Sequence, residues 1–322
     1  MSRRMPRRRV APVLPAVCAT LVLALAGCAR SLGQMGHDGL DLDGEHSAAV
    51  DPVPLSGRSW QTVSVPANVP AAVHLPAKPG AAESRSVLAL PVEFEGDNGA
   101  DSGNAYFVRL LPAYEWPVRP TWRIQHMDLI LLADAPGGIA GAPGNPEPVR
   151  GPRAFGLSDI THISLFTPEM PGPYLVGVGA ALGIPTATDD VLGSGKWSAG
   201  PALRLTYRKG PWNLGFVAAQ RWSFAGDPDR AEVSQLMVRG AFRRQLDENW
   251  FLVSAPIITA NWNASAGERW LLPLGGGIGR TFDFAGRPWA VSLQGYANVI
   301  RPTGAPTWSV RLSMTTSIPL DR

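Results

Sequence analysis

Two histidines with nearby hydroxyl and carboxylate residues are the groups in this sequence that could carry out acyl-transfer chemistry. His126 and His162 fall on neighbouring predicted strands, and Ser158, Asp128 and Asp159 lie close to them in sequence. In a Ser-His-Asp arrangement the histidine takes the serine proton and the carboxylate orients the histidine. The sequence has no G-x-S-x-G turn to present a nucleophile. Two histidines on adjacent strands more often satisfy polar or interfacial positions, so we expect no enzyme activity.

Metal and cofactor sites have weaker support. Asp189 and Asp190, with two threonines nearby, offer oxygen ligands of the kind that Ca²⁺ prefers, but no third carboxylate is close, which favours a solvated turn. The run Gly275–Gly277 lacks the Lys-Ser/Thr that follows a phosphate-binding loop, so it predicts a bend in a strand. Three more histidines are widely spaced within residues 30–85. We therefore predict no metal and no cofactor.

The elements that must position these residues are β-strands. Between Gly195 and Gly226 apolar residues occupy every second position on both sides of a short break at Lys209–Pro211. Strict alternation predicts a hairpin whose two faces meet different environments. The same pattern starts at Ser86 and predicts twelve strands. They are Ser86–Glu95, Asn104–Trp116, Thr121–Ala133, Gly156–Thr167, Tyr174–Ile184, Lys196–Tyr207, Trp212–Phe224, Glu232–Gln245, Trp250–Trp262, Trp270–Phe282, Trp289–Ile300 and Thr307–Ile318.

The connections between these strands alternate between short turns and longer polar loops. Short turns on one rim and long loops on the other are typical of outer-membrane barrels, in which the strand number is even. The fold class we predict is therefore all-β, a twelve-stranded antiparallel transmembrane up-and-down β-barrel. The strand Thr121–Ala133 is irregular, because His126 and Asp128 interrupt its apolar face, and we expect a bulge there. The loop Asp134–Phe155 either folds inward as a constriction or stays exposed.

Tryptophan placement supports a membrane location. The distance from Trp212 to Trp222 is ten residues, about 33 Å of strand, or roughly 25 Å along the membrane normal after tilting. That height matches the apolar band between two interfacial girdles of aromatic residues. Ten tryptophans lie at predicted strand ends and none at mid-strand, and we assign them to the girdles. They are Trp116, Trp122, Trp197, Trp212, Trp222, Trp250, Trp262, Trp270, Trp289 and Trp308.

Charged residues between apolar neighbours identify the face of each strand that points into the barrel. Arg204 lies between Leu203 and Leu205, and turning it outward would cost about 2–4 kcal/mol near the bilayer midplane. Such residues must therefore point inward. The lumen-lining set we predict is Arg109, Glu115, Arg204, Arg221, Arg239 and Arg311.

The amino terminus resembles a bacterial secretion signal. A charged start and an apolar segment lead to Leu25-Ala26-Gly27-Cys28, which resembles the site where a lipoprotein signal is cleaved before a lipid-modified cysteine. We predict a signal peptide at residues 1–27, lipidation at Cys28, a flexible periplasmic tether at residues 28–85 and the barrel at residues 86–322. The predicted signal peptide contains five arginines, and without them the rest of the chain has 24 basic and 26 acidic residues in place of the net charge of +3. Nucleic acid is therefore not an expected partner.

Several blocks of the barrel region resemble one bacterial family. They are AFGLSDI at Ala154–Ile160, LGIPTATDDVLGSGKWSAGP at Leu182–Pro201, WSFAGDPDRAEVSQ at Trp222–Gln235 and APIITANWNASAGERWLLPLGGGIGR at Ala255–Arg280. These blocks are similar to the outer-membrane barrel family named after the MetA pathway of phenol degradation, whose members are described as transporters. The resemblance implies an outer-membrane barrel that passes small organic molecules, and it transfers no catalytic residue.

The expected function is passive passage of small, aromatic or hydrophobic molecules across the outer membrane of a Gram-negative bacterium. The expected partners are outer-membrane lipid, a small-molecule permeant and the barrel-assembly machinery. Many outer-membrane barrels end on an aromatic residue that this machinery reads, whereas the present chain ends Pro319-Leu320-Asp321-Arg322. Two alternatives stay open: a closed structural barrel whose interior is filled by the same charged side chains, and an outer-membrane lipid hydrolase.

Overall fold

The computed structural model describes residues 86–119, 121–137 and 151–320. The predicted signal peptide, Cys28 and tether lie outside these residues and stay predictions. The described residues form fifteen strand segments and two short 3₁₀ helices. They are β1 (Ser86–Asn98), β2 (Ala105–Leu110), β3 (Ala113–Arg119), β4 (Trp122–Ala135), β5 (Ala154–Leu157), β6 (Ile160–Pro168), β7 (Tyr174–Ile184), η1 (Asp190–Leu192), β8 (Lys196–Lys209), β9 (Trp212–Gly226), β10 (Ser234–Gln245), β11 (Trp250–Ser254), β12 (Ile257–Asn261), η2 (Ala266–Glu268), β13 (Trp270–Phe284), β14 (Arg287–Ile300) and β15 (Trp308–Leu320).

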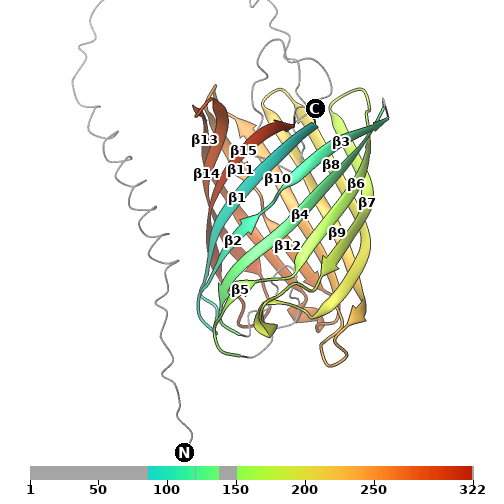
Figure 1. The fold of residues 1–322 in the computed structure, drawn as a ribbon. Helices are drawn as coiled ribbons and strands as arrows, with labels where there is room; N and C mark the ends of the chain where they lie inside the picture. The colour runs from blue at the N-terminus through green and yellow to red at the C-terminus, as the bar shows by residue number, and fades with distance from the viewer. Residues whose placement is uncertain (1–85, 120, 138–150, 321–322) are drawn as a thin grey trace, which may run out of the picture. The chain divides into compact units, whose positions relative to one another are not determined.

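The strands form a closed antiparallel barrel (Figure 1). Each strand pairs with its sequence neighbours, and β1 pairs with β15 from Ser86↔Leu320 to Asn98↔Trp308, so no free edge is left among them. Three pairs of consecutive segments, β2/β3, β5/β6 and β11/β12, each make a single crossing of the wall. The barrel therefore has twelve strands, as the alternation predicts. No helix among the described residues is long and apolar enough to cross a membrane.

Proline explains two of the three interruptions. Pro112 separates β2 from β3 and Pro256 separates β11 from β12, because proline has no N–H to donate to the ladder. The third interruption, at Ser158 and Asp159, inserts one extra residue opposite β4 and is a β-bulge.

The predicted bulge at His126 and Asp128 is wrong. The β4–β6 ladder runs without a shift from Trp122↔Pro168 to Leu129↔Thr161. Because the alternation is kept, His126 and Asp128 stay on the same face as Ile124 and Ile130.

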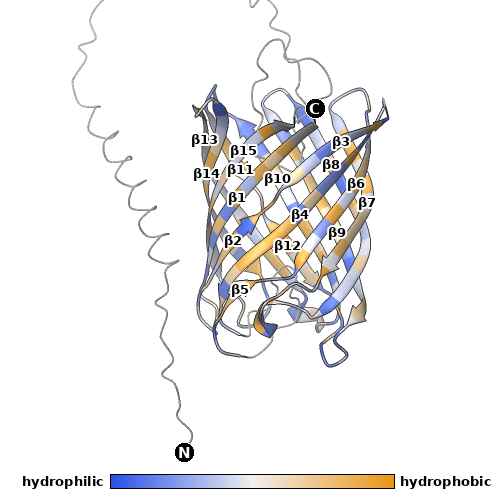
Figure 2. Cartoon of the chain, viewed as in Figure 1, coloured by the Kyte–Doolittle hydropathy of each residue, from blue (hydrophilic) through white to orange (hydrophobic). Residues whose placement is uncertain are grey.

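Polar and apolar residues alternate along many of the strands (Figure 2), and burial alternates with them. On β8, for example, Leu203 and Leu205 are exposed, whereas Ala202, Arg204 and Thr206 are buried. The buried face is the inside of the barrel, where polar and charged residues lie beside small apolar ones. The exposed face is mostly apolar, which is the reverse of a soluble protein.

The connections differ in length between the two rims. Tight turns join β8 to β9 and β13 to β14, and the latter uses Ala285 and Gly286 with φ of 53° and 72°. Two consecutive positive φ values are typical of the two-residue hairpin turn that matches the twist of antiparallel strands. The opposite rim carries the longer connections, among them residues 185–195 with η1 and residues 262–269 with η2.

Candidate functional site

The six predicted lumen residues all lie on the inner wall. Five of them, Arg109, Glu115, Arg204, Arg221 and Arg311, expose 9% of their surface or less. Arg239 is on the same face of β10 and exposes 12% of its side chain. Their positions follow from the strand alternation alone, whereas their partners come from strands far apart in the chain.

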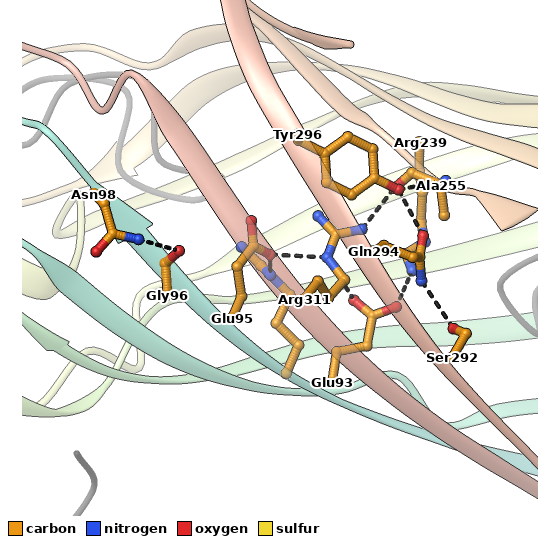
Figure 3. A network of polar contacts seen from close by, with 11 residues as sticks. Glu93, Glu95, Gly96, Asn98, Arg239, Ala255, Ser292, Gln294, Tyr296 and Arg311 are labelled. Atoms are coloured by element: carbon orange, nitrogen blue, oxygen red, sulfur yellow. Dashed lines mark hydrogen bonds and ion pairs between the residues drawn. The ribbon is translucent and has the colours of Figure 1, made fainter. Parts of the chain in front are cut away.

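An ion-pair network joins β1, β2, β10 and β15 (Figure 3). Glu95 accepts from Arg109 and, at 2.9 Å, from Arg311 Nε. Glu93, which is fully buried, accepts from Arg239 Nη2 at 2.5 Å and lies 3.8 Å from Arg311 Nε. Three guanidinium groups therefore share two carboxylates, and the network carries a net positive charge.

Polar groups of β14 and of the β11/β12 break hold Arg311 in place. Arg311 Nη1 donates to the carbonyl oxygen of Ala255 at 2.6 Å, and its guanidinium lies 5.0 Å from the Tyr296 ring centroid. The Tyr296 hydroxyl donates to Gln294 Oε1 at 2.6 Å and accepts from the Ala255 N–H at 2.7 Å (Figure 3). The break before Pro256 frees these backbone groups, and the interior network uses them.

A second polar group lies toward the short-turn rim. Arg123 Nη1 lies 3.2 Å from Glu115 Oε1, and Arg123 Nε lies 2.8 Å from Glu169 Oε1. Arg204 donates to Gln125 Oε1 and, through Nε at 3.3 Å, to Thr206 Oγ1. The hydrogen-bond partners of Arg204 are therefore neutral groups.

Two further arginines have only neutral partners among the contacts seen in the described residues. Arg221 donates to Ser198 Oγ at 3.2 Å and to Gln235 Oε1 at 2.9 Å. Arg243 lies 3.7 Å from the centroid of the Phe251 ring and donates to Gln245 Oε1 at 2.8 Å. A side chain at Gly279 would meet the Phe251 ring, so the glycine makes room for this stack.

The inner wall of the described barrel is richer in arginines than in carboxylates. The inward-facing arginines are Arg109, Arg123, Arg204, Arg208, Arg221, Arg239, Arg243 and Arg311, and the inward-facing strand carboxylates are Glu93, Glu95, Asp97 and Glu115. Several guanidinium nitrogens have no protein acceptor among the described residues, namely Arg109 Nε, Arg204 Nη2, Arg221 Nε, Arg239 Nη1 and Arg243 Nη1. Buried charged donors require an acceptor, and water or a permeating anion can supply one.

An apolar section of the same wall runs from β4 to β12. Its residues are small or aliphatic: Leu129, Ile163, Leu165, Ala181, Ala202, Val217, Ala219, Met237 and Ile257. The interior therefore combines buried apolar residues with the ion-pair network on β1, β2, β10 and β15, and the strands β8, β9 and β10 carry both apolar and arginine side chains. Sequence reasoning did not single out this apolar section, because alternation marks which residues face inward and not which of them gather.

The loop between β7 and β8 folds onto the inner wall near the long-loop rim. Leu192 of η1 is buried against Phe107, Leu131 and Ala133. The loop is held by Asp159, whose Oδ2 accepts from the Ser194 N–H at 2.7 Å and from the Ser194 hydroxyl at 2.6 Å. Inward folding was one of the two alternatives for Asp134–Phe155, whose residues 138–150 lie outside the described part of the chain.

The hydrolase candidates Ser158 and Asp159 belong to this loop anchor. The Ser158 hydroxyl donates to the carbonyl oxygen of Leu192 at 2.5 Å, and Asp159 holds Ser194. Both side chains are buried and are directed away from His126 and His162, which face outward. Asp189 caps η1 by accepting from the Val191 N–H at 2.9 Å, and no group of acidic, histidine or cysteine side chains among the described residues fits a metal ion.

The predicted girdle tryptophans surround the apolar band on the outside. Trp116, Trp122, Trp212, Trp250 and Trp289 lie at the short-turn ends of their strands, and Trp197, Trp222, Trp262, Trp270 and Trp308 lie at or next to the long-loop ends. A closed barrel with an apolar outer surface between two rings of aromatic residues is the architecture of bacterial outer-membrane proteins. The chain is an outer-membrane β-barrel.

Comparison with solved structures agrees with this fold. An outer-membrane channel from Pseudomonas putida F1 matches with a TM-score of 0.50 at 12% identity, covering 75% of this chain and 100% of that one. The CymD monoaromatic hydrocarbon channel matches with a TM-score of 0.40 at 8% identity, covering 75% and 90%. The translocator domain of the autotransporter NalP from Neisseria meningitidis gives 0.39 at 7% identity, covering 75% and 90%. No family model and no curated protein matches the sequence.

Sequence reasoning missed part of the interior charge. Glu93 and Glu95 lie between Val92, Phe94 and Gly96, in the same apolar–charged alternation that identified Arg204. The signal for these two carboxylates was therefore present in the sequence.

Proposed function

We propose that this protein is a passive channel for small molecules that combine an apolar body, such as an aromatic ring, with a negative charge. The observation that carries the proposal is the set of interior guanidinium nitrogens without a protein acceptor. A dry, filled interior would leave these groups unsatisfied, at a cost of about 1–3 kcal/mol or more each. The same nitrogens have no contact with solvent in this structure, so water or a permeating anion reaches them when neighbouring side chains move apart.

The charged and the apolar residues of the interior together define the permeant. The excess of arginine favours anions, because fixed charges in a narrow lumen select by sign. The apolar section from Leu129 to Ile257 is buried in the interior, and it would contact a hydrocarbon or aromatic body that enters between the packed side chains. The resemblance to the family named after the MetA pathway of phenol degradation supports passage of aromatic compounds, and the likeness to an outer-membrane channel supports a channel.

Conductance of the purified, folded barrel in a planar lipid bilayer tests the proposal. We expect discrete current steps and, in a KCl gradient, a reversal potential that shows preference for chloride. In liposome swelling, benzoate should enter faster than benzylamine, which has a similar size and the opposite charge. Absence of steps in repeated insertions would instead establish a closed structural barrel, and equal rates for both solutes would contradict charge selection.

The remaining partners follow from the location. Outer-membrane lipid contacts the apolar band, and we propose that the barrel-assembly machinery inserts the chain.

A further inference from the structure

A hydrogen-bonded polar cluster lies on the lipid-facing surface of the barrel. The cluster consists of His126 and Asp128 on β4 and His162 and Ser164 on β6. All four side chains point outward, because the neighbouring positions Gln125, Leu129, Ile163 and Leu165 are the buried, inward ones. The ladder places His126 opposite Ser164 and Asp128 opposite His162. The cluster is therefore built on two adjacent strands and not on loops.

The cluster is an exception on an apolar surface. Asp128 is the only carboxylate at an outward position in the middle of a described strand, and both histidines of the described residues lie beside it. Ionisable groups within the membrane are costly and are a mark of function. Arginines that face outward on β10 and β13, Arg244 and Arg280, lie near strand ends over Trp212 and Trp250.

The distances within the cluster are those of a Ser-His-Asp triad. His162 Nδ1 lies 2.7 Å from Asp128 Oδ1, and His162 Nε2 lies 2.9 Å from Ser164 Oγ. With the proton on Nδ1, the histidine donates to the carboxylate and its Nε2 accepts from the serine hydroxyl. This tautomer is the one in which histidine acts as the base and the carboxylate orients it. The side chains of His162 and Asp128 are 29% and 25% exposed, so the site is open on its outer side.

A second histidine supplies a donor beside the serine. His126 Nδ1 lies 2.8 Å from Ser164 Oγ and 3.4 Å from His162 Nε2, and the Tyr114 ring stacks on His126 with centroids 4.8 Å apart. Since the backbone of β6 is engaged in the sheet, the imidazole of His126 is the group placed to donate to an oxygen that becomes negative next to Ser164.

We propose that Ser164, His162 and Asp128 form a hydrolase site for long-chain carboxylic esters that reach it from the bilayer. Ser164 Oγ attacks the ester carbonyl carbon while its proton passes to His162 Nε2, and the oxyanion accepts a hydrogen bond from His126. The carbon–oxygen bond to the alcohol breaks, and the alcohol leaves with that proton. Water, deprotonated by His162, then releases the fatty acid and restores Ser164. Ser164 and His162 are catalytic residues, and Asp128 is a positioning residue.

The surroundings of Ser164 fit an acyl chain. Phe166 and Val178, exposed on the same face, provide an apolar surface, and the residue opposite Ser164 on β7 is the small Ala180. Ser164 is four residues from Pro168, which pairs with the girdle residue Trp122. That spacing places it about 10 Å below the girdle along the membrane normal. The ester must therefore enter the hydrocarbon layer, and it comes either from a phospholipid or from a neutral ester dissolved there.

Labelling with a long-chain fluorophosphonate tests the nucleophile directly. The Ser164 oxygen displaces fluoride and forms a stable bond to phosphorus, which mass spectrometry detects on the peptide that contains Ser164. We expect labelling of the folded, full-length protein in liposomes, none in Ser164→Ala and unchanged labelling in Ser254→Ala, an outward-facing serine of β11 without a histidine neighbour. Ser158→Ala should also label normally. Labelling at another residue, or none in protein whose conductance shows it to be folded, would overturn the proposal.

Hydrolysis rates identify the roles and the ester source. Ser164→Ala and His162→Ala should lower kcat by on the order of 10³-fold or more, and Asp128→Asn by on the order of 10²–10⁴-fold with KM unchanged. Release of p-nitrophenol from its laurate ester without release from labelled phospholipid assigns a dissolved neutral ester, and the reverse assigns the phospholipid. Inactivity of the wild type toward both esters would refute the site. The site would also be refuted if the inactive wild type formed a dimer that His162→Ala dissociates. Either result leaves the channel proposal untouched.

Discussion

At the scale of single residues, the interior arginines differ in how their charge is balanced. Arg109, Arg239 and Arg311 share two glutamates, whereas Arg204 has Gln125 and Thr206 as hydrogen-bond partners. An arginine whose hydrogen-bond partners are neutral adds more positive charge to the field in the lumen than an arginine that is paired with a glutamate.

The first prediction concerns Arg204. Because Arg204 is 1% exposed on the inner wall and its hydrogen bonds go to neutral groups, Arg204→Glu should shift the reversal potential toward cations. Arg204→Lys keeps the charge and should keep the anion preference. The measurement is the reversal potential of single channels in a KCl gradient. An unchanged value in Arg204→Glu would mean that ions do not pass this residue.

The two serines of the β5/β6 crossing show how a residue's role depends on its neighbours. Ser158 contacts the η1 loop, and Ser164 contacts both histidines. The bulge at Ser158 and Asp159 decides this, because one extra residue changes which positions face outward. The activity that the sequence argued against therefore has a candidate site after all, with a different serine.

At the scale of elements, the long loops contact one another at the rim. Glu268 at the end of η2 accepts from the Thr303 N–H at 2.5 Å and from the Thr303 hydroxyl at 2.7 Å. These two hydrogen bonds hold the pKa of Glu268 below its ordinary value of 4.5. A carboxylate whose pKa is lowered in the folded state favours that state above its ordinary pKa, and the contribution is lost as the pH falls through the lowered value.

The second prediction follows from this contact between loops. At pH 6 the Thr303 amide should exchange its hydrogen more slowly in the wild type than in Glu268→Gln, after correction for intrinsic rates. The protection in the wild type should decline as the pH falls below 4.5. Glu248→Gln, which changes a carboxylate in the β10–β11 turn, serves as the control. Equal protection in the wild type and Glu268→Gln would show that the carboxylate does not hold the loops together.

A comparable contact stabilises the turn between β10 and β11. Asp247 Oδ1 accepts from the backbone N–H groups of Asn249 and Trp250, both at 2.8 Å, and these bonds lower the pKa of Asp247. An aspartate that bonds to its own backbone two residues on is a common turn signal. Short turns of this kind set the register of the long hairpins, so that Arg239 and Arg243 on β10 keep their inward positions.

At the scale of the whole molecule, the barrel is stable only if its two faces remain distinct. The outer face contacts hydrocarbon and the inner face holds charges, so a one-residue slip would exchange Leu203 for Arg204 at the lipid surface. The closure of β1 on β15 removes the last free edge and with it the unpaired backbone groups that a bilayer cannot satisfy.

The third prediction measures this distinction between faces. Leu203→Arg, at an outward position in the middle of β8, should lower the free energy of unfolding in liposomes by about 2–4 kcal/mol. Tyr174→Arg, outward at the short-turn end of β7, should cost about 0–1 kcal/mol because an interfacial arginine reaches water. Urea titration of both variants gives the comparison. Equal costs at the two positions would contradict the assigned depth.

The sequence alone determined the class of fold, since a period of two over long strands with aromatic ends can be read locally. It also determined the direction of Arg204 and its companions, because the cost of an arginine in lipid allows one orientation. The tertiary structure decided which of these residues meet: Arg239 reaches Glu93 across 146 positions and Arg311 reaches Glu95 across 216. It also brought His126, His162 and Ser164 together. Such pairings depend on barrel register and closure, and these are properties of all the strands at once.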